Sequence, residues 1–188
     1  MIKKRISFLK VLGSLGLPFL VLLLIPGILI ISFGHANSAI GSGFPTTAIA
    51  IFMIIPLFTI GLFLLISTNW YFIQQGKGTL APWDPPKFFI PEGPYRFLRN
   101  PMIVGVLLVL LSEVIFFRSF ALFFWWIFFL ITNLVYMPLV EEKELAKRFG
   151  DEYLKYKANV PAWFPRIKPW VGKESMDNGN EEKNKNGR

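Results

Sequence analysis

The stretch that decides the fold is PTTAIAIFMIIPLFTIGLFLLI, residues 45–66, which carries no charged side chain. It lies within a longer region, Val11–Gly76, that contains no Lys, Arg, Asp or Glu. A soluble domain needs charged groups on its surface, whereas about 20 consecutive apolar residues match the hydrocarbon thickness of a bilayer. The region therefore indicates an integral membrane protein.

Further apolar runs of similar length lie on both sides of this segment. The expected spans are roughly 11–33, 45–66 (or as far as 73), 101–117 and 119–140. Backbone groups in lipid have no water to bond, so each span should be an α-helix. Only Arg118 and Ser119 separate the last two runs, which predicts a tight helical hairpin. The predicted fold is all-α, with about four transmembrane helices and a cytoplasmic amphipathic helix near the C-terminus.

Basic residues predict the orientation of the spans. With four spans, nineteen of the 20 Lys and Arg residues fall on one side, and only Arg118 falls on the other. The positive-inside rule makes the richer side cytoplasmic, so both termini should be cytoplasmic, in a bacterial inner membrane or an endoplasmic reticulum. The net charge of +8 is explained by attraction to anionic lipid headgroups and requires no nucleic acid. No protein partner can be predicted from the sequence.

Three polar segments meet on the predicted cytoplasmic side. They are the loop 76–100, the charged segment EEKELAKRFGDEYLKYKANV at 141–160, and PAWFPRIKPW at 161–170. We divide the chain into two N-terminal spans (1–73), a core (74–170) and a polar tail (171–188) that we expect to be disordered. The chain has no cysteine, which excludes disulfides and thiolate sites, and we predict no metal site.

Two motifs in the core carry a family resemblance. GPYRFLRNPM (93–102), followed by EEKELAKRFGDEYLKYKANVP (141–161), resembles the isoprenylcysteine carboxyl methyltransferase family, which shares a superfamily with phospholipid methyltransferases. The matching positions are Gly93, Tyr95, Arg99, Pro101, Gly105, Glu141, Glu142, Phe149, Gly150, Tyr153, Tyr156, Val160 and Pro161. The resemblance implies a membrane-embedded enzyme that uses S-adenosyl-L-methionine to methylate a lipophilic acceptor entering from the bilayer. Its cofactor pocket would not be a Rossmann fold, and no G-x-G-x-x-G occurs here.

The resemblance also implies site residues. Cofactor contacts are implied for Lys87, Phe88, Phe89, Ile90, Tyr95, Asn100, Pro101, Met102, Ile103 and Glu141. Carboxylates suit the cofactor's ammonium or ribose, and aromatic faces suit its adenine or sulfonium. The predicted catalytic residues are Glu142 and Arg99, with Glu142 the nearest base for an amine or hydroxyl acceptor.

Each of these residues also has a simpler interpretation. Glu141 and Glu142 could open an amphipathic helix, where acidic side chains favour the positive terminus. Tyr95 and Arg99 could be interfacial anchors at the foot of a span. We expect Leu145 and Phe149 to pack rather than to bind ligand.

Glu113 lies inside the third predicted span. An ionisable residue at that depth is a functional candidate. The alternative is a pairing with Arg118 or Asn133, and Glu113 is not among the assigned catalytic residues.

Three positions depart from the family pattern. Asn100 replaces a histidine and cannot change charge near neutral pH, and Ile103 replaces a tyrosine. Met137 stands where the isoprenylcysteine enzymes carry an arginine that engages the acceptor's carboxylate. A carboxylate in an apolar pocket needs such a partner, so the expected acceptor is a lipid or lipophilic small molecule other than a prenylated cysteine.

Two other functions are open at this point. The first is an NADPH-dependent membrane reductase, because sterol reductases have a similar C-terminal half, although they are much longer. The second is a non-catalytic membrane module, for which Asn100 and Ile103 are the best arguments.

Overall fold

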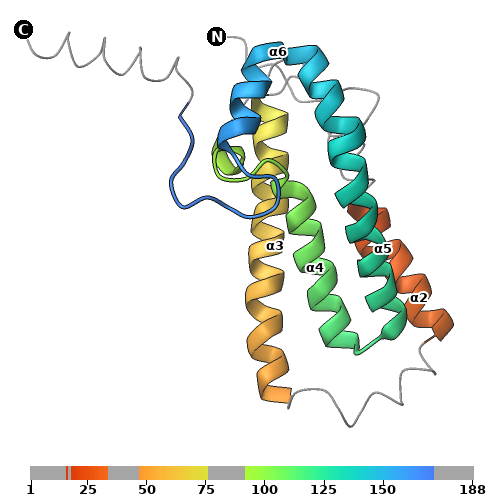
Figure 1. The fold of residues 1–188 in the computed structure, drawn as a ribbon. Coiled ribbons are helices and arrows are strands. Elements are labelled where there is room, and N and C mark those ends of the chain that lie inside the picture. Colours follow the sequence, from red (N-terminus) through yellow and green to blue (C-terminus); the bar gives the residue numbers. More distant parts are fainter. Residues whose placement is uncertain (1–15, 17, 34–46, 76–91, 172–188) are drawn as a thin grey trace, which may run out of the picture.

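The computed structural model describes residues 16, 18–33, 47–75 and 92–171, and no strand occurs among them. Helices α2, α4 and α5 and the long α3 lie side by side in the order α3, α4, α5, α2, and α6 arches over one end of them (Figure 1). In chain order the elements are η1 (Leu20–Leu24), α2 (Ile25–Phe33), α3 (Thr47–Gln75), η3 (Gly93–Arg96), α4 (Pro101–Phe117), α5 (Phe120–Tyr136), η4 (Met137–Glu141) and α6 (Glu142–Asn159).

Two of the described helices are long and apolar enough to cross a membrane. They are Ala48–Tyr71 within α3, and Phe120–Asn159, where α5 continues through η4 into α6. Only 17% of the apolar window of each helix is buried inside the protein. A core helix of a soluble protein would be mostly buried, so these outward apolar faces support contact with lipid. Leu20–Phe33 and Pro101–Phe117 are shorter apolar helices.

The helix boundaries follow local chemistry. Helix α4 spans the predicted 101–117, because Pro101 favours a first helical position and Arg118 adopts the left-handed conformation, with φ 49°. Ser119 then accepts a hydrogen bond from the amide of Leu122 and caps α5, which confirms the tight hairpin. Helix α3 continues to Gln75, beyond both predicted ends.

The fourth predicted span does not end its helix at Val140. The π-helical turn η4 carries the chain into α6, and Pro138, which has no N–H to donate, lies in that wider turn. The helix predicted over 141–160 is present as α6, so the polar segment is a continuation of the last apolar helix rather than a separate element.

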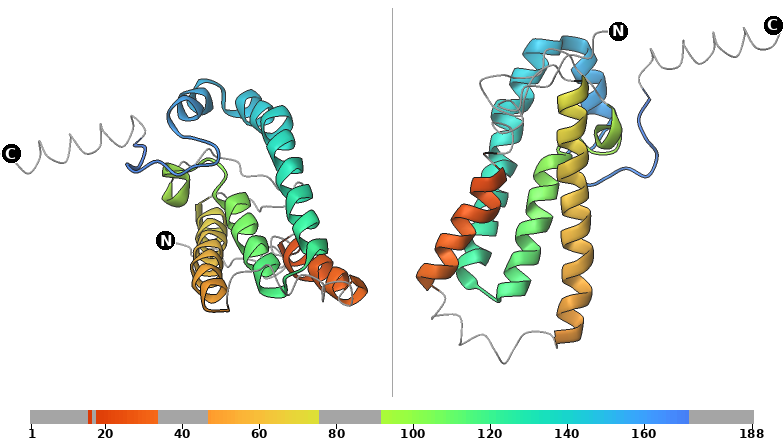
Figure 2. Two further views of the ribbon diagram at one scale, coloured as in Figure 1. Left: turned by 60° about the horizontal axis from the view of Figure 1, so that its bottom comes forward. Right: turned by 180° about the vertical axis from the view of Figure 1, so that it is seen from behind.

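Two glycines bring α3 and α4 into backbone contact. A Cβ added to Gly61 would lie 2.8 Å from the carbonyl oxygen of Gly105, and one added to Gly105 would lie 2.9 Å from that of Gly61. Small residues allow this close approach where apolar helices pack in a membrane. Gly105, a position of the family motif, therefore has a packing reason. Figure 2 shows α4 between α3 and α5 from two further sides.

Helix α6 consists of two limbs joined at Gly150, whose backbone is not helical (φ 53°, ψ −133°). In a straight helix Glu142 and Lys157 would be about 22 Å apart at about 1.5 Å per residue. Instead Lys157 Nζ lies 2.8 Å from Glu142 Oε2, so the second limb folds back toward the start of the first. Glycine suits this position because a side chain disfavours a positive φ.

Candidate active site

Three segments meet at the end of the molecule where α6 lies. They are the loop Gly93–Asn100, the start of α6, and Pro161–Trp170, which we name the strap. The amide of Arg99 donates to the carbonyl oxygen of Pro161 at 2.9 Å, and the amide of Trp170 donates to that of Arg96 at 2.8 Å. The convergence expected of the two motifs and the segment that follows them is therefore present between described residues. The loop 76–91 is outside the described residues, and with it Lys87, Phe88, Phe89 and Ile90, as is the tail from 172 onward.

The loop is held against α3 and α6 by two further contacts. Gly93 has φ +55°, and a Cβ there would lie 2.3 Å from the ring of Tyr71 on α3. The hydroxyl of Tyr156 on α6 donates to the carbonyl oxygen of Tyr95 at 2.7 Å. Gly93 and Tyr156 are motif positions, and both act here by fixing the path of the chain between α3 and α4.

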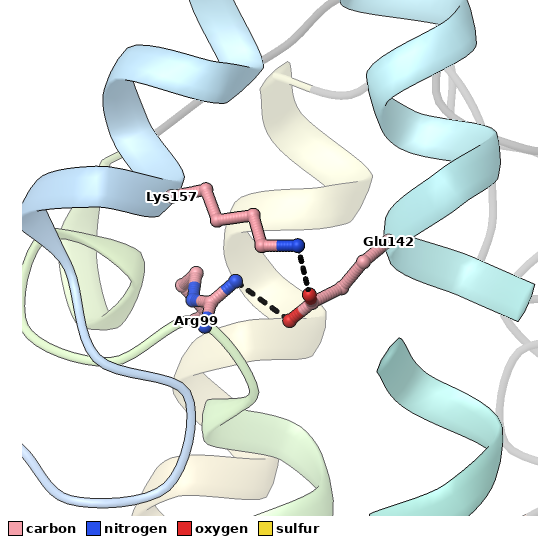
Figure 3. Close-up of polar contacts among 3 residues, drawn as sticks. All are labelled: Arg99, Glu142 and Lys157. Carbon is pink, nitrogen blue, oxygen red and sulfur yellow. Dashed lines mark hydrogen bonds and ion pairs between the residues drawn. The ribbon is translucent and has the colours of Figure 1, made fainter. Parts of the chain in front are cut away.

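A buried carboxylate lies at the centre of the site, with a cation on each oxygen. Glu142 Oε1 accepts from Arg99 Nη1 at 2.6 Å, and Lys157 Nζ lies 2.8 Å from Oε2 (Figure 3). The side chain of Glu142 is 7% exposed and that of Arg99 13%, whereas Lys157 is 43% exposed. Charge-assisted hydrogen bonds of this length are among the stronger ones, and they compensate the desolvation of the buried carboxylate.

The structure thus brings the two predicted catalytic residues into direct contact. Arg99 and Glu142 come from different motifs, 43 residues apart in the chain. Both oxygens of the Glu142 carboxylate are already engaged by cations. In this arrangement Glu142 is better suited to holding Arg99 in place than to accepting a proton.

Glu141 has a different environment, although it precedes Glu142 directly. It follows the last residue of the fourth predicted span, and no ion pair of Glu141 is found within the described part of the chain. Burial raises the pKa of its carboxyl, and the neighbouring charges of Glu144 and Glu142 raise it further. A carboxyl with a raised pKa is a better proton acceptor than an ordinary one.

Tyr95 is electrostatically coupled to Glu141. Burial raises the pKa of the Tyr95 phenol well above its usual value, with smaller contributions from Tyr156 and Glu141. The phenol is therefore neutral at physiological pH and can donate a hydrogen bond. Two predicted cofactor contacts from separate motifs, Tyr95 and Glu141, are therefore close enough for the charge of Glu141 to raise the pKa of Tyr95.

Unused hydrogen-bond donors mark the foot of α4. Arg99 Nε and Asn100 Nδ2 are buried and have no acceptor among the described residues. Asn100 precedes Pro101 at the start of α4 and makes no side-chain cap. The first helical amides, including those of Met102 and Ile103, have no intrahelical acceptor by geometry. Buried donors are almost always paired, so this group suits a ligand that carries acceptor atoms.

An aromatic cluster supports the site from the side of α6. Tyr153, Tyr156 and Val160 are buried, and Leu145, Phe149 and Trp170 pack against them, which confirms Leu145 and Phe149 as packing residues. Burial and then the Glu142 charge raise the pKa of Tyr153 to about 12, although the charge of Arg99 and a hydrogen bond with it oppose the shift. Tyr153 is thus a neutral neighbour of the ion pairs.

The remaining sequence candidates fall at other depths. Met137 is buried in η4, at 6% exposure, one turn before Glu141. Glu113 lies in the second half of α4, and its Oε2 is buried without a hydrogen bond from any described residue. Asn133 donates instead to the carbonyl oxygen of Phe129, and no ion pair joins Glu113 to Arg118 among the described residues. The pairing considered for Glu113 is therefore wrong for this structure.

An apolar cavity of about 510 Å³ lies between α2 and α5, away from the polar cluster. It offers no group that could recognise a cofactor, so it is not part of the candidate active site. Its lining residues are Leu29, Phe33, Phe120, Ala121, Phe124, Trp125 and Phe128.

A family model described as phospholipid methyltransferase matches residues 49–152, more than half of the chain. The chain belongs to this family. Membership implies a membrane methyltransferase that acts on lipids, which confirms the superfamily indicated by the two motifs. The match includes Arg99, Glu141 and Glu142, while Lys157 and the strap lie beyond its end. No curated protein matches the chain.

Proposed function

We propose that this phospholipid methyltransferase family member uses S-adenosyl-L-methionine to methylate an amine or hydroxyl of a lipid dissolved in the membrane. The observation that carries the proposal is the Arg99–Glu142 contact of 2.6 Å. It joins the two motifs beside the partly buried Glu141 and the unused donors of Arg99 and Asn100. A cofactor that carries both a carboxylate and an ammonium needs hydrogen-bond donors and an acidic side chain in one place.

The residues present fit the cofactor's polar groups. Arg99 Nε, Asn100 Nδ2 and the first amides of α4 can donate to its carboxylate, and Glu141 can accept from its ammonium or ribose hydroxyls. When bound, the cofactor supplies an electrophilic methyl group on a positively charged sulfur. The protein's task is to align the acceptor atom with that methyl group and to exclude water. The predicted contacts at Tyr95, Pro101, Met102 and Ile103 belong to the same proposal.

We assign different roles to the two adjacent glutamates. Glu142, held by Arg99 and Lys157, acts as a positioning residue that keeps Arg99 directed into the site. Glu141, with its raised pKa, is the better acceptor for the proton that an amine or hydroxyl loses on methylation. This replaces the base role that the sequence suggested for Glu142.

The proposed topology has four spans with both termini in the cytoplasm. It is supported by the basic residues Arg99, Lys157 and Arg166, which gather at the end of the molecule opposite Arg118. The core 74–170 would then hold the whole site at the cytoplasmic surface, where a lipid acceptor arrives sideways from the leaflet. A cation at Met137 is lacking, so a prenylcysteine carboxylate is not the proposed acceptor.

Thermal unfolding of the detergent-solubilised protein tests the cofactor. A ligand that binds only the folded state stabilises it, by about 2.7 kcal/mol at 100 times its Kd. S-adenosylhomocysteine should raise the Tm and NADPH should not. A shift with NADPH alone would support the reductase alternative, and no shift with either ligand would support a non-catalytic module. The Arg99→Met/Glu142→Leu double variant, which lacks the ion pair, is the control: S-adenosylhomocysteine should not raise its Tm.

A further inference from the structure

The strap presents large apolar side chains outside the membrane-spanning helices. Ile167 is 96% exposed, more than any other large apolar side chain in the described part of the chain, and Phe164 is 82% exposed. The strap also contains Arg166, Lys168 and two tryptophans, but no acidic residue. Tryptophan, bulky apolar and basic side chains together are typical of segments that lie at a membrane surface.

The strap is a fixed part of the structure. The amide of Arg166 donates to the carbonyl oxygen of Phe97 at 3.0 Å, and Arg96 Nε donates to that of Trp170 at 2.9 Å. A guanidinium nitrogen of Arg166 also donates to the last carbonyl of α6, that of Asn159, at 2.8 Å. Prolines recur at every fourth position, Pro161, Pro165 and Pro169, and restrict the backbone further. Phe164 and Ile167 are thus held outward by a backbone that cannot readily fold them inward.

The position of the strap identifies what it faces. It lies beside η3 and the first residues of α4 in all three views (Figures 1 and 2). Phe97, whose carbonyl the strap binds, is itself 36% exposed and precedes the start of α4 by four residues. The exposed apolar side chains of the strap therefore lie at the level where the apolar residues of α4 begin.

We propose that the strap is a membrane-surface anchor for an anionic leaflet. Phe164 and Ile167 insert at the boundary between headgroups and acyl chains, about 5–10 Å deep. Lys168 and the free edge of the Arg166 guanidinium face lipid phosphates, consistent with the chain's net charge of +8. An uncharged apolar surface on another protein could bind Phe164 and Ile167, but it would not require the basic residues that flank them.

The anchor has a consequence that rests on the proposed function. Because Pro161 binds the amide of Arg99, the depth of the strap sets the depth of the Arg99–Glu142 site. The site would then stand at the height of a lipid headgroup, where the acceptor atom of a phospholipid lies. The anchor itself requires no catalysis.

The depth of the strap can be measured directly, because the chain has no cysteine. A single cysteine at Phe164 or Ile167 takes a nitroxide label in the full-length protein, reconstituted in phosphatidylcholine with about one third phosphatidylglycerol. Lys155→Cys, exposed on α6, provides the aqueous control, and Ile31→Cys, 83% exposed on α2, provides the lipid control. Power saturation by oxygen and by a water-soluble nickel chelate reports depth. All four sites are exposed, so substitution should not affect folding.

We expect labels at 164 and 167 to be several-fold more accessible to oxygen than to the nickel chelate, and Lys155→Cys to show the reverse. Nickel accessibility equal to that at Lys155→Cys would overturn the proposal. Low accessibility to both reagents would overturn it too, because it means that protein covers the strap. An unchanged depth in pure phosphatidylcholine would refute the requirement for anionic lipid. None of these readouts depends on methyl transfer, so the anchor and the proposed function can fail separately.

Discussion

Replacing either cation that contacts Glu142, Arg99 or Lys157, should lower the stability of the fold, and the loss should be larger for the more buried cation. Arg99 is 13% exposed and its partner 7%, so Arg99→Met leaves a buried carboxylate with one oxygen unpaired. Breaking a buried pair in this way costs about 3–5 kcal/mol. Lys157 is 43% exposed, and solvent screening reduces its share, so Lys157→Met should cost about 1 kcal/mol.

The matched control is Lys155→Met, on the same limb of α6. Lys155 is exposed and forms no ion pair among the described residues, so its replacement should change the stability by less than about 0.5 kcal/mol. Equilibrium unfolding in mixed detergent micelles measures all three variants. Equal stability of Lys157→Met and Lys155→Met would refute the fold-back of α6 onto Glu142. Equal losses for Arg99→Met and Lys157→Met would refute the burial argument.

Four further outcomes are expected. Glu141→Gln should stabilise the apo-protein at neutral pH, because the pKa of Glu141 is raised in the folded state and the folded protein therefore loses stability as the pH rises from the unfolded pKa of this group through its folded pKa. The gain should vanish in acid, where the carboxyl is protonated in both states, and a uniform gain at every pH would contradict this. The same change should weaken S-adenosylhomocysteine binding by about 2–5 kcal/mol, as measured by titration, whereas Glu113→Gln should not, and equal affinities would exclude Glu141 as a contact. Gly105→Ala should cost about 1–3 kcal/mol in micelle unfolding, because its Cβ would meet the Gly61 carbonyl at 2.9 Å, and an unchanged stability would argue against that contact. Topology reporters at the loop 34–44 and at the C-terminus should report opposite sides, and a shared side would remove the four-span topology.

The apolar helices could be predicted because the bilayer imposes their composition. The bounds of α4 were predictable for a local reason, since Pro101 and the pair Arg118–Ser119 punctuate an unbroken apolar run. The end of the fourth span was not predictable in the same way. Val140 ends the apolar residues, but the backbone remains helical through η4, and polarity alone does not stop a helix.

The site could be predicted only in part, for a physical reason. Motif positions indicated Arg99 and Glu142, but the partner of the second oxygen, Lys157, carries no motif signal. It reaches Glu142 only because Gly150 reverses the helix, and a single glycine in a helical pattern does not reveal a positive φ. The meeting of the strap with the loop was expected from the sequence, but its path was not, because the bonds between Arg166 and Phe97 and between the Trp170 amide and Arg96 use backbone groups that every sequence provides.

Methyl transfer itself tests the central claim most directly. The purified protein in lipid nanodiscs receives S-adenosylmethionine labelled on the methyl group, with either a total lipid extract or a farnesylcysteine analogue. We predict saturable labelling of a lipid amine or hydroxyl, with at least about a thirtyfold loss in kcat/KM for Arg99→Met, which is the lower end of the loss of about 2–5 kcal/mol for a buried charged contact. Saturable labelling of the farnesylcysteine carboxylate, or no labelled lipid under conditions where S-adenosylhomocysteine binds, would contradict the account.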